Sequence, residues 1–374
     1  MDVGAGVDGG GPRNLRRVHG STLTPSPGRN IRHRTRMSAA AILRRYERDG
    51  GCSCSPVRAT SVTTRNRPGS ATRRGPIVNA TRAPEYTSSI AETSLGPVEY
   101  AVVGTGAPVV VLHGSPGGID AAALMARMLP RDRISAILLS RPGYLGTDLA
   151  GRTTIDEQAD LVAALLDHLG IERAGVYTWS GGGPAGYRFA VRHPGRVTAL
   201  VANAAVSRAY ELPHQDLPTR LLFTTAPGQW LMRLLAAHQP QQFVQGTLSS
   251  EGDLGPEELT ARVEQVFADP DARQFVLDLG PASMPDKVRR AGFRNDLDRF
   301  AEITSLELGR ITAPTLVVQG TADADLPPAH STFAAAAVPG AELLTLDRGT
   351  HLALYIHPDA AAAQARVVDF LLRR

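Results

Sequence analysis

The stretch YTWSGGGP, residues 177–184, places one serine, Ser180, between strand-forming residues and three glycines. A serine hydroxyl is a weak nucleophile until a base removes its proton, and the base needs a third group to fix its tautomer. Two later segments offer such groups, namely TADADLPP with Asp323 and RGTHL with His351. Serine, acid and histidine in this chain order predict nucleophilic catalysis through a covalent intermediate.

Each of these residues also has a structural explanation. A serine among glycines is often a plain loop residue. Asp323 could instead form a turn, and Asp325 could replace it as the acid. His351 competes with nine other histidines, of which His168 and His193 stand at predicted helix ends. The catalytic interpretation is favoured because the acid and the histidine follow consecutive predicted strands, downstream of the serine.

Ser180 lies where a predicted strand, AGVYTW, runs directly into a predicted helix. So sharp a turn leaves room only for small side chains two positions away on either side, which gives the pattern G-x-S-x-G. Gly182 fills the second of these positions, and Thr178 stands where the first glycine is usual. The helix that begins after Ser180 favours negative charge nearby. The sequence therefore predicts that Ser180 is exposed on a strand-to-helix elbow.

A tetrahedral oxyanion needs N–H donors aimed at it. We expect one from the backbone of Gly181, the residue after the nucleophile. The loop after VVVLHG should supply a second, and Ser115 is the candidate because Pro116 has no N–H. His113, in the same loop, is expected to be structural.

These residues require parallel strands whose carboxyl ends meet at one edge of a sheet. The predicted strands are SSIAETS, PVEYAVVG, APVVVLHG, RISAILLS, ERAGVYTW, RVTALVANAA, APTLVVQG and AELLTLD. Helical segments alternate with most of them, whereas residues 207–310 contain only helical patterns. This order predicts an α/β fold with a mostly parallel, doubly wound sheet and a helical cap insertion. The predicted core is residues 85–206 and 311–374, and the cap is residues 207–310.

Residues 1–84 are predicted to be a disordered, arginine-rich tail, because they are poor in aromatics and lack periodicity apart from one short possible helix at residues 39–48. Sixteen arginines against four acidic residues give this segment +12, so the other 290 residues carry −8 of the total +4. A non-functional extension, a targeting segment and an arm for nucleic acid or another anionic surface all remain open as explanations.

Composition excludes several classes of function for the folded region. Its acidic balance argues against nucleic-acid binding, and the sequence has no apolar run long enough to span a membrane. Both cysteines, Cys52 and Cys54, lie in the tail, so we expect no disulfide or cysteine-based metal site. The pattern GAGVDG at residues 4–9 lacks the flanking strand and helix of a dinucleotide site. We predict a cytoplasmic protein that has a small-molecule substrate and uses no metal or cofactor.

Five segments resemble the successive landmarks of the α/β-hydrolase superfamily, namely VVLHGSPGG, SRPGYLGTD, TWSGGGPAGYRFAVRHPGRV, GTADADLPP and DRGTHLAL. The resemblance covers about residues 95–206 and 311–374. It implies that Ser180 is the nucleophile, Asp323 the acid, His351 the base and Ser115 part of the oxyanion hole. The segment SRPGYLGTD is similar to a structural turn, to which we assign no chemistry. A serine nucleophile fits poorly with the dehalogenase and epoxide-hydrolase branches.

The resemblance implies a serine hydrolase that acts through an acyl-enzyme on a small ester-like carboxylic substrate. One alternative is an aminopeptidase of the proline-iminopeptidase type, which needs a cap carboxylate to hold the substrate's ammonium group. Candidates for it are Glu251, Glu257, Glu258 and Glu264, although exposed helix faces explain these residues equally well. A second alternative is a hydrolase-derived ligand-binding protein with little turnover. The apolar cap residues serve either packing or a pocket, and the oligomeric state is left open; these residues are Phe223, Trp230, Leu231, Met232 and Leu234.

Overall fold

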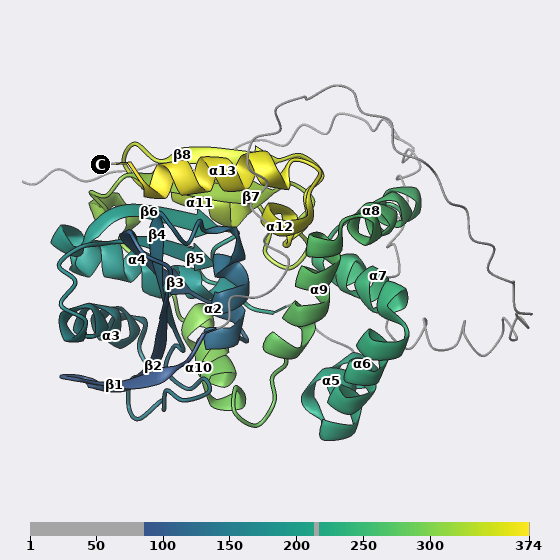
Figure 1. The fold of residues 1–374 in the computed structure, drawn as a ribbon, viewed down its shortest axis with the longest axis horizontal. Coiled ribbons are helices and arrows are strands. Elements are labelled where there is room, and N and C mark those ends of the chain that lie inside the picture. Colours follow the sequence, from purple (N-terminus) through teal and green to yellow (C-terminus); the bar gives the residue numbers. More distant parts are fainter. Residues whose placement is uncertain (1–85, 213–216, 374) are drawn as a thin grey trace, which may run out of the picture. The chain divides into compact units, whose positions relative to one another are not determined.

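An eight-stranded sheet organises the chain in the computed structural model, which describes residues 86–212 and 217–373 (Figure 1). All of these residues belong to the larger of the two units of the chain, residues 38–374. The predicted tail 1–84, with its short helix at 39–48 and both cysteines, lies outside the described residues.

Each predicted strand segment contains one strand of this sheet. The strands are β1 Ser89–Thr93, β2 Gly96–Val103, β3 Ala107–Leu112, β4 Ile134–Leu139, β5 Ala174–Trp179, β6 Val197–Asn203, β7 Thr315–Gly320 and β8 Glu342–Leu346. Their order is β1-β2-β4-β3-β5-β6-β7-β8. Strands β1 and β2 pair antiparallel, as do β2 and β4, and all other neighbours are parallel.

Helices cover both faces of the sheet. Helices α2 (Ile119–Met125), α12 (Ala353–Ile356) and α13 (Ala360–Leu371) lie on one face, and α3 (Ile155–His168), α4 (Gly183–Arg192) and α11 (Ala329–Ala337) lie on the other. Alternate β3 residues enter the two cores, since Val109 packs in one and Val110 in the other. Burial on both faces explains why this strand reads as a continuous apolar run.

The long insertion is helical, as predicted. It contains α5 Leu217–Thr224, α6 Ala226–His238, α7 Pro240–Glu251, α8 Pro256–Ala268, α9 Pro270–Ala282 and α10 Arg290–Ala301. Helix α10 differs from a cap helix, because its Phe300 is buried in the core that holds α3 and α4. Its Gly292 N–H also donates to the carbonyl of Gly143, at 2.9 Å. The apolar residues of α6 are not tightly packed, since Trp230 is 62% exposed and Leu231 39% exposed.

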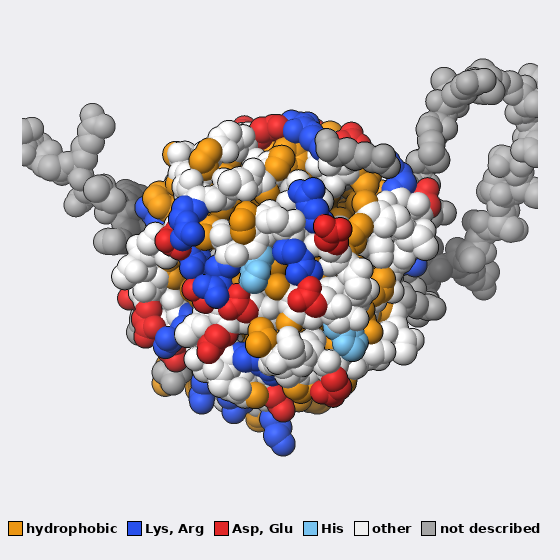
Figure 2. Space-filling view, turned by 90° about the vertical axis from the view of Figure 1, so that its left-hand side faces the viewer, with side chains coloured by type: hydrophobic (Ala, Val, Ile, Leu, Met, Phe, Trp, Pro, Cys, Tyr) orange, Lys and Arg blue, Asp and Glu red, His pale blue; other side chains and the backbone are white. Residues whose placement is uncertain are grey.

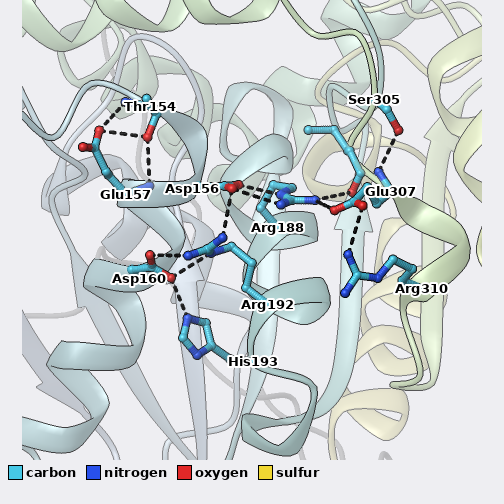
Figure 3. A network of polar contacts seen from close by, with 11 residues as sticks. Thr154, Asp156, Glu157, Asp160, Arg188, Arg192, His193, Ser305, Glu307 and Arg310 are labelled. Atoms are coloured by element: carbon cyan, nitrogen blue, oxygen red, sulfur yellow. Dashed lines mark hydrogen bonds and ion pairs between the residues drawn. The ribbon is translucent and has the colours of Figure 1, made fainter.

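A network of ion pairs joins α3 and α4 on the side of the molecule away from the cap (Figure 3). Arg188 pairs with Asp156 and Glu307, and Arg192 pairs with Asp160. On the face drawn in Figure 2, acidic and basic side chains of the described residues are interspersed rather than gathered by sign. Within the described ranges, no helix combines the length and apolar character that a membrane crossing requires.

Candidate active site

The polypeptide turns sharply at Ser180, between β5 and α4. Every residue of β5 is buried up to Trp179, and Ser180 then has a φ of +52°. A side chain with a Cβ rarely adopts this left-handed conformation, which costs about 1–3 kcal/mol unless the surroundings impose it. Here the sheet fixes the residue before the turn and the helix fixes those after it. The local strain is the one that a strand-to-helix elbow predicts.

Small residues make room for this elbow on both sides. A Cβ on Gly182 would lie 2.5 Å from the carbonyl oxygen of Leu112, a backbone atom that cannot move aside. Thr178 is fully buried, and a Cβ on Gly186 would lie only 3.1 Å from its methyl group. A glycine is therefore not required at position 178, because Gly186, one turn into α4, leaves room for the threonine side chain. The threonine hydroxyl has no hydrogen-bond partner among the described residues.

His351 and Asp323 meet beyond the ends of β8 and β7. The Nδ1 of His351 lies 2.8 Å from Oδ2 of Asp323, and both side chains are almost fully buried. Asp323 is held in turn by Gln319 Nε2 at 2.9 Å and by the Leu326 N–H at 2.8 Å. The histidine ring stacks on Trp179, the residue before Ser180, with ring centroids 5.5 Å apart. The structure therefore brings all three predicted catalytic residues to one edge of the sheet.

Two further carboxylates approach His351 from its other side. Oδ2 of Asp325 lies 3.4 Å from Nε2 of His351, and Glu251 contributes a third carboxylate from the end of α7. Burial alone would lower the pKa of His351, but the negative charges of Asp323, Asp325 and Glu251 raise it to about 10. Burial and the neighbouring Asp325 raise the pKa of Glu251 to about 8. Both groups therefore hold a proton more firmly than an isolated histidine or glutamate does.

The backbone of Glu251 connects the long insertion to the loops that carry Asp323 and His351. Its carbonyl oxygen accepts hydrogen bonds from the N–H of Ala324, at 3.2 Å, and of His351, at 3.0 Å. From the sequence, Glu251 is only one of four candidate glutamates for binding an ammonium group. Of the other three, Glu258 pairs with Arg348, and Glu257 and Glu264 are exposed. No local pattern distinguishes Glu251 from them, because the contact depends on how the insertion folds back onto the core.

The same cluster is a geometric candidate for a metal ion. Ligand atoms of Glu251, Asp325 and His351 lie within 4.8 Å of one another, the one such group in the described parts of the chain. Imidazole and carboxylate ligands of this kind suit zinc or another divalent transition metal. A bound metal would occupy the histidine nitrogen that a general base needs, so the two uses of His351 are mutually exclusive.

The predicted oxyanion-hole residues lie side by side. A Cβ on Gly181 would be 2.3 Å from Oγ of Ser115, so the two segments are in close contact. The Ser115 N–H donates no hydrogen bond to any described residue. Gly181 lies in the first turn beyond the elbow, where helical N–H groups have no acceptor within the helix. Both N–H groups are thus available to a ligand beside Ser180.

His113 is structural, as expected. It is fully buried, and its Nε2 accepts a hydrogen bond from the Arg141 backbone N–H at 3.0 Å. Its Nδ1 therefore carries the proton and donates to the carbonyl of Gly114, at 2.8 Å. Burial and the Arg141 charge hold the pKa of His113 well below its usual value. The neutral ring cannot act as a second base, since both of its nitrogens are occupied.

Comparison with known proteins identifies the family of this chain. A solved structure, an alpha/beta hydrolase fold protein from Nakamurella multipartita, is 49% identical, covers 76% of this chain and 99% of its own, and superposes with a TM-score of 0.75. "Uncharacterized hydrolase YcgS" of Bacillus subtilis is 27% identical over 282 residues, which cover 74% of this chain and 95% of that protein. A pimeloyl-[acyl-carrier protein] methyl ester esterase of Neisseria meningitidis is 28% identical over 252 residues, covering 66% and 71%. The model of the alpha/beta hydrolase fold family matches residues 107–358, so this chain belongs to that family.

Proposed function

We propose that this hydrolase is a serine esterase that forms an acyl-enzyme with a small ester-like carboxylic substrate. The observation that carries the proposal is the strained φ of +52° at Ser180, together with a buried histidine that stacks on the preceding Trp179 and whose Nδ1 is held by Asp323 at 2.8 Å. Strained backbone conformations cluster at functional sites, where the position of the side chain matters. The similarity to a methyl ester esterase supports the choice of an ester.

The reaction would proceed in two stages, acylation of Ser180 and hydrolysis of the acyl-enzyme. Ser180 Oγ attacks the carbonyl carbon of the ester while Nε2 of His351 accepts its proton, and Asp323 stabilises the resulting imidazolium. The oxyanion accepts hydrogen bonds from the N–H groups of Ser115 and Gly181. His351 then returns the proton to the departing alkoxide, which leaves as the alcohol. In the second stage, water attacks the acyl-enzyme, passes a proton through His351 to Ser180, and releases the acid.

A fluorophosphonate probe tests the nucleophile, and p-nitrophenyl esters of rising chain length test the substrate class. We expect wild-type labelling to be lost in Ser180→Ala and retained in the control Ser207→Ala, whose buried serine follows the neighbouring strand β6. Labelling that survives Ser180→Ala would refute the mechanism. Labelling without turnover of any ester or of proline-β-naphthylamide would instead favour a ligand-binding protein.

A second candidate, an aminopeptidase, is favoured by the carboxylate pair beside His351. Oε2 of Glu251 is buried without a hydrogen-bond partner among the described residues, and Asp325 is its neighbour in the cluster. An ammonium group of a substrate would satisfy both carboxylates. Hydrolysis of proline-β-naphthylamide in preference to the esters, and its selective loss in Glu251→Gln, would promote this candidate over the esterase.

A further inference from the structure

We propose that Arg141 and Asp296 are positioning residues, a buried ion pair that aims the backbone N–H of Ser115 at the reacting oxygen. The inference deepens the proposed function and rests on it. Neither residue has a role in the chemistry assigned from the sequence, where the segment SRPGYLGTD is only a structural turn and residue 296 falls within the expected cap.

The Arg141 guanidinium contacts three consecutive residues of the loop after β3. Its Nε donates to the carbonyl of His113 at 3.1 Å, and its Nη2 donates to the carbonyl of Gly114 at 3.1 Å. The same Nη2 lies 2.8 Å from Oγ of Ser115. These contacts come from a side chain that is only 2% exposed, so water does not compete for them.

Asp296 fixes the other side of the guanidinium. Its Oδ1 accepts from Nη1 at 2.9 Å and its Oδ2 from Nη2 at 2.6 Å, in a two-pronged pairing. Oδ2 also accepts from the hydroxyls of Ser115 and Tyr144. The Asp296 side chain is only 1% exposed, and among the described residues these donors are its only partners. Such a pair constrains geometry more than it adds stability.

The contacts of Arg141 with the Gly114 carbonyl also fix the orientation of the Ser115 N–H. The carbonyl of Gly114 and the N–H of Ser115 belong to one planar trans peptide unit and point in opposite directions. Holding the carbonyl against Arg141 therefore turns the N–H away from Arg141. The same loop lies against the elbow, because a Cβ on Gly114 would lie 3.3 Å from the Cβ of Ser180 and a Cβ on Gly181 would lie 2.3 Å from Ser115 Oγ. The ion pair thus selects one orientation of an N–H that has no hydrogen-bond acceptor among the described residues.

Helix α10 gives this arrangement its connection to the rest of the fold. It carries Asp296, and it is anchored to the core by Asn295 Nδ2, which donates to the carbonyl of Thr153 at 2.9 Å. The loop that carries Ser115, in the first half of the chain, is therefore held by α10, the last helix of the long insertion.

The test distinguishes an effect on the orientation of the Ser115 N–H from an effect on the stability of the folded protein. We would compare Arg141→Lys, Asp296→Asn and Tyr144→Phe with the control Arg188→Lys, whose guanidinium also joins several elements but lies in the network of Figure 3. Active sites are titrated with the fluorophosphonate probe, and inhibition constants are measured for a trifluoromethyl ketone, which resembles the tetrahedral intermediate, and for a carboxylic acid product. Inhibition constants do not depend on the folded fraction of the enzyme.

For Arg141→Lys and Asp296→Asn we expect kcat per titrated site to fall about 100-fold, as for a misplaced catalytic group. The ketone should bind more weakly in parallel, whereas KM and the affinity for the acid should change little. Tyr144→Phe keeps the ion pair and should show a smaller effect in the same direction. Arg188→Lys should lower Tm without changing the affinity for the ketone.

If the charge variants do not fold, Tyr144→Phe carries the test, together with hydrogen exchange of the loop amides. Unchanged ketone affinity in every folded variant would overturn the inference while leaving the esterase proposal intact. A wild-type protein that the fluorophosphonate does not label would overturn both, since no oxyanion would then form at this site.

Discussion

Replacing Asp325 by asparagine should extend the activity of this hydrolase to lower pH. Asp325 is the carboxylate closest to Nε2 of His351, at 3.4 Å, and it favours the protonated imidazole. His351 can accept a proton from Ser180 only in its neutral form, which predominates above its pKa. Because that pKa is raised to about 10, the acidic limb of kcat/KM should lie well above the ordinary histidine value of 6.5. Removing the charge of Asp325 lowers the pKa and moves the limb down.

The size of this shift follows from Coulomb's law. At 3.4 Å the attraction is about 1.2 kcal/mol in a water-like medium and about 5 kcal/mol at an effective dielectric constant of about 20. These limits correspond to roughly 1 and 3.5 pKa units. The Asp325 side chain is 38% exposed, so water screens the interaction and the lower part of the range applies. We expect a shift of about 1 to 2 pH units.

The assay is the pH dependence of kcat/KM for a p-nitrophenyl ester, which reports on the free enzyme. Asp325→Asn should keep its plateau activity, so near pH 7 it should be roughly 10-fold to 100-fold faster than wild type. The matched control is Asp323→Asn, which leaves the geometry but fixes the wrong tautomer and should cost about 10⁴-fold at every pH. An unshifted limb in Asp325→Asn would refute the electrostatic argument. If the plateau of kcat/KM in Asp325→Asn fell as far as in Asp323→Asn, Asp325 would be the acid that orients His351.

Three further predictions concern the elbow and the candidate metal cluster. Thr178→Val should raise the free energy of unfolding by roughly 1 kcal/mol, because it removes a buried hydroxyl without a partner, and urea denaturation measures this as a higher midpoint with an unchanged m value. Gly182→Ala should abolish labelling by the fluorophosphonate probe, because its Cβ would lie 2.5 Å from a carbonyl oxygen. Chelation with EDTA should leave esterase activity unchanged, whereas added Zn²⁺ should inhibit it by binding Glu251, Asp325 and His351; activity lost with EDTA and restored by Zn²⁺ would contradict both expectations.

The strands and helices of the core could be predicted because the local sequence pattern of each element agrees with its place in the fold. The run VVVL between polar segments is buried on both faces, as a continuous apolar strand requires. Helix α3 begins where Thr154 and Glu157 form a capping box, a pattern visible in the sequence. The cap boundary was less predictable. Helix α10 has the helical pattern of its neighbours, but Phe300 and Asp296 face the core, and only the folded chain shows which surface receives them.

The site was partly predictable for a similar reason. Ser180, Asp323 and His351 each follow a strand, so the edge of a parallel sheet brings them together without further information. The elbow accommodates Thr178 because Gly186, eight residues later, has no side chain to collide with it. Gly186 lies one turn into the predicted helix, so the helical periodicity of the sequence could have suggested this contact. Arg141 and Asp296 are separated by 155 residues, and no spacing rule connects them. Contacts of that kind arise from the tertiary fold alone.

At the end of α7, backbone hydrogen bonds join the cap to the loops that carry Asp323 and His351. The Glu251 carbonyl accepts from Ala324 and His351, and the Asp253 N–H donates to the Ala322 carbonyl at 2.8 Å. A rigid-body opening of this part of the cap would break bonds to the loops that carry the acid and the histidine, so access must depend on other cap segments. These bonds use only backbone atoms, so Glu251→Gln leaves them in place. The effect of that substitution on amide and ester hydrolysis therefore reports on the carboxylate itself.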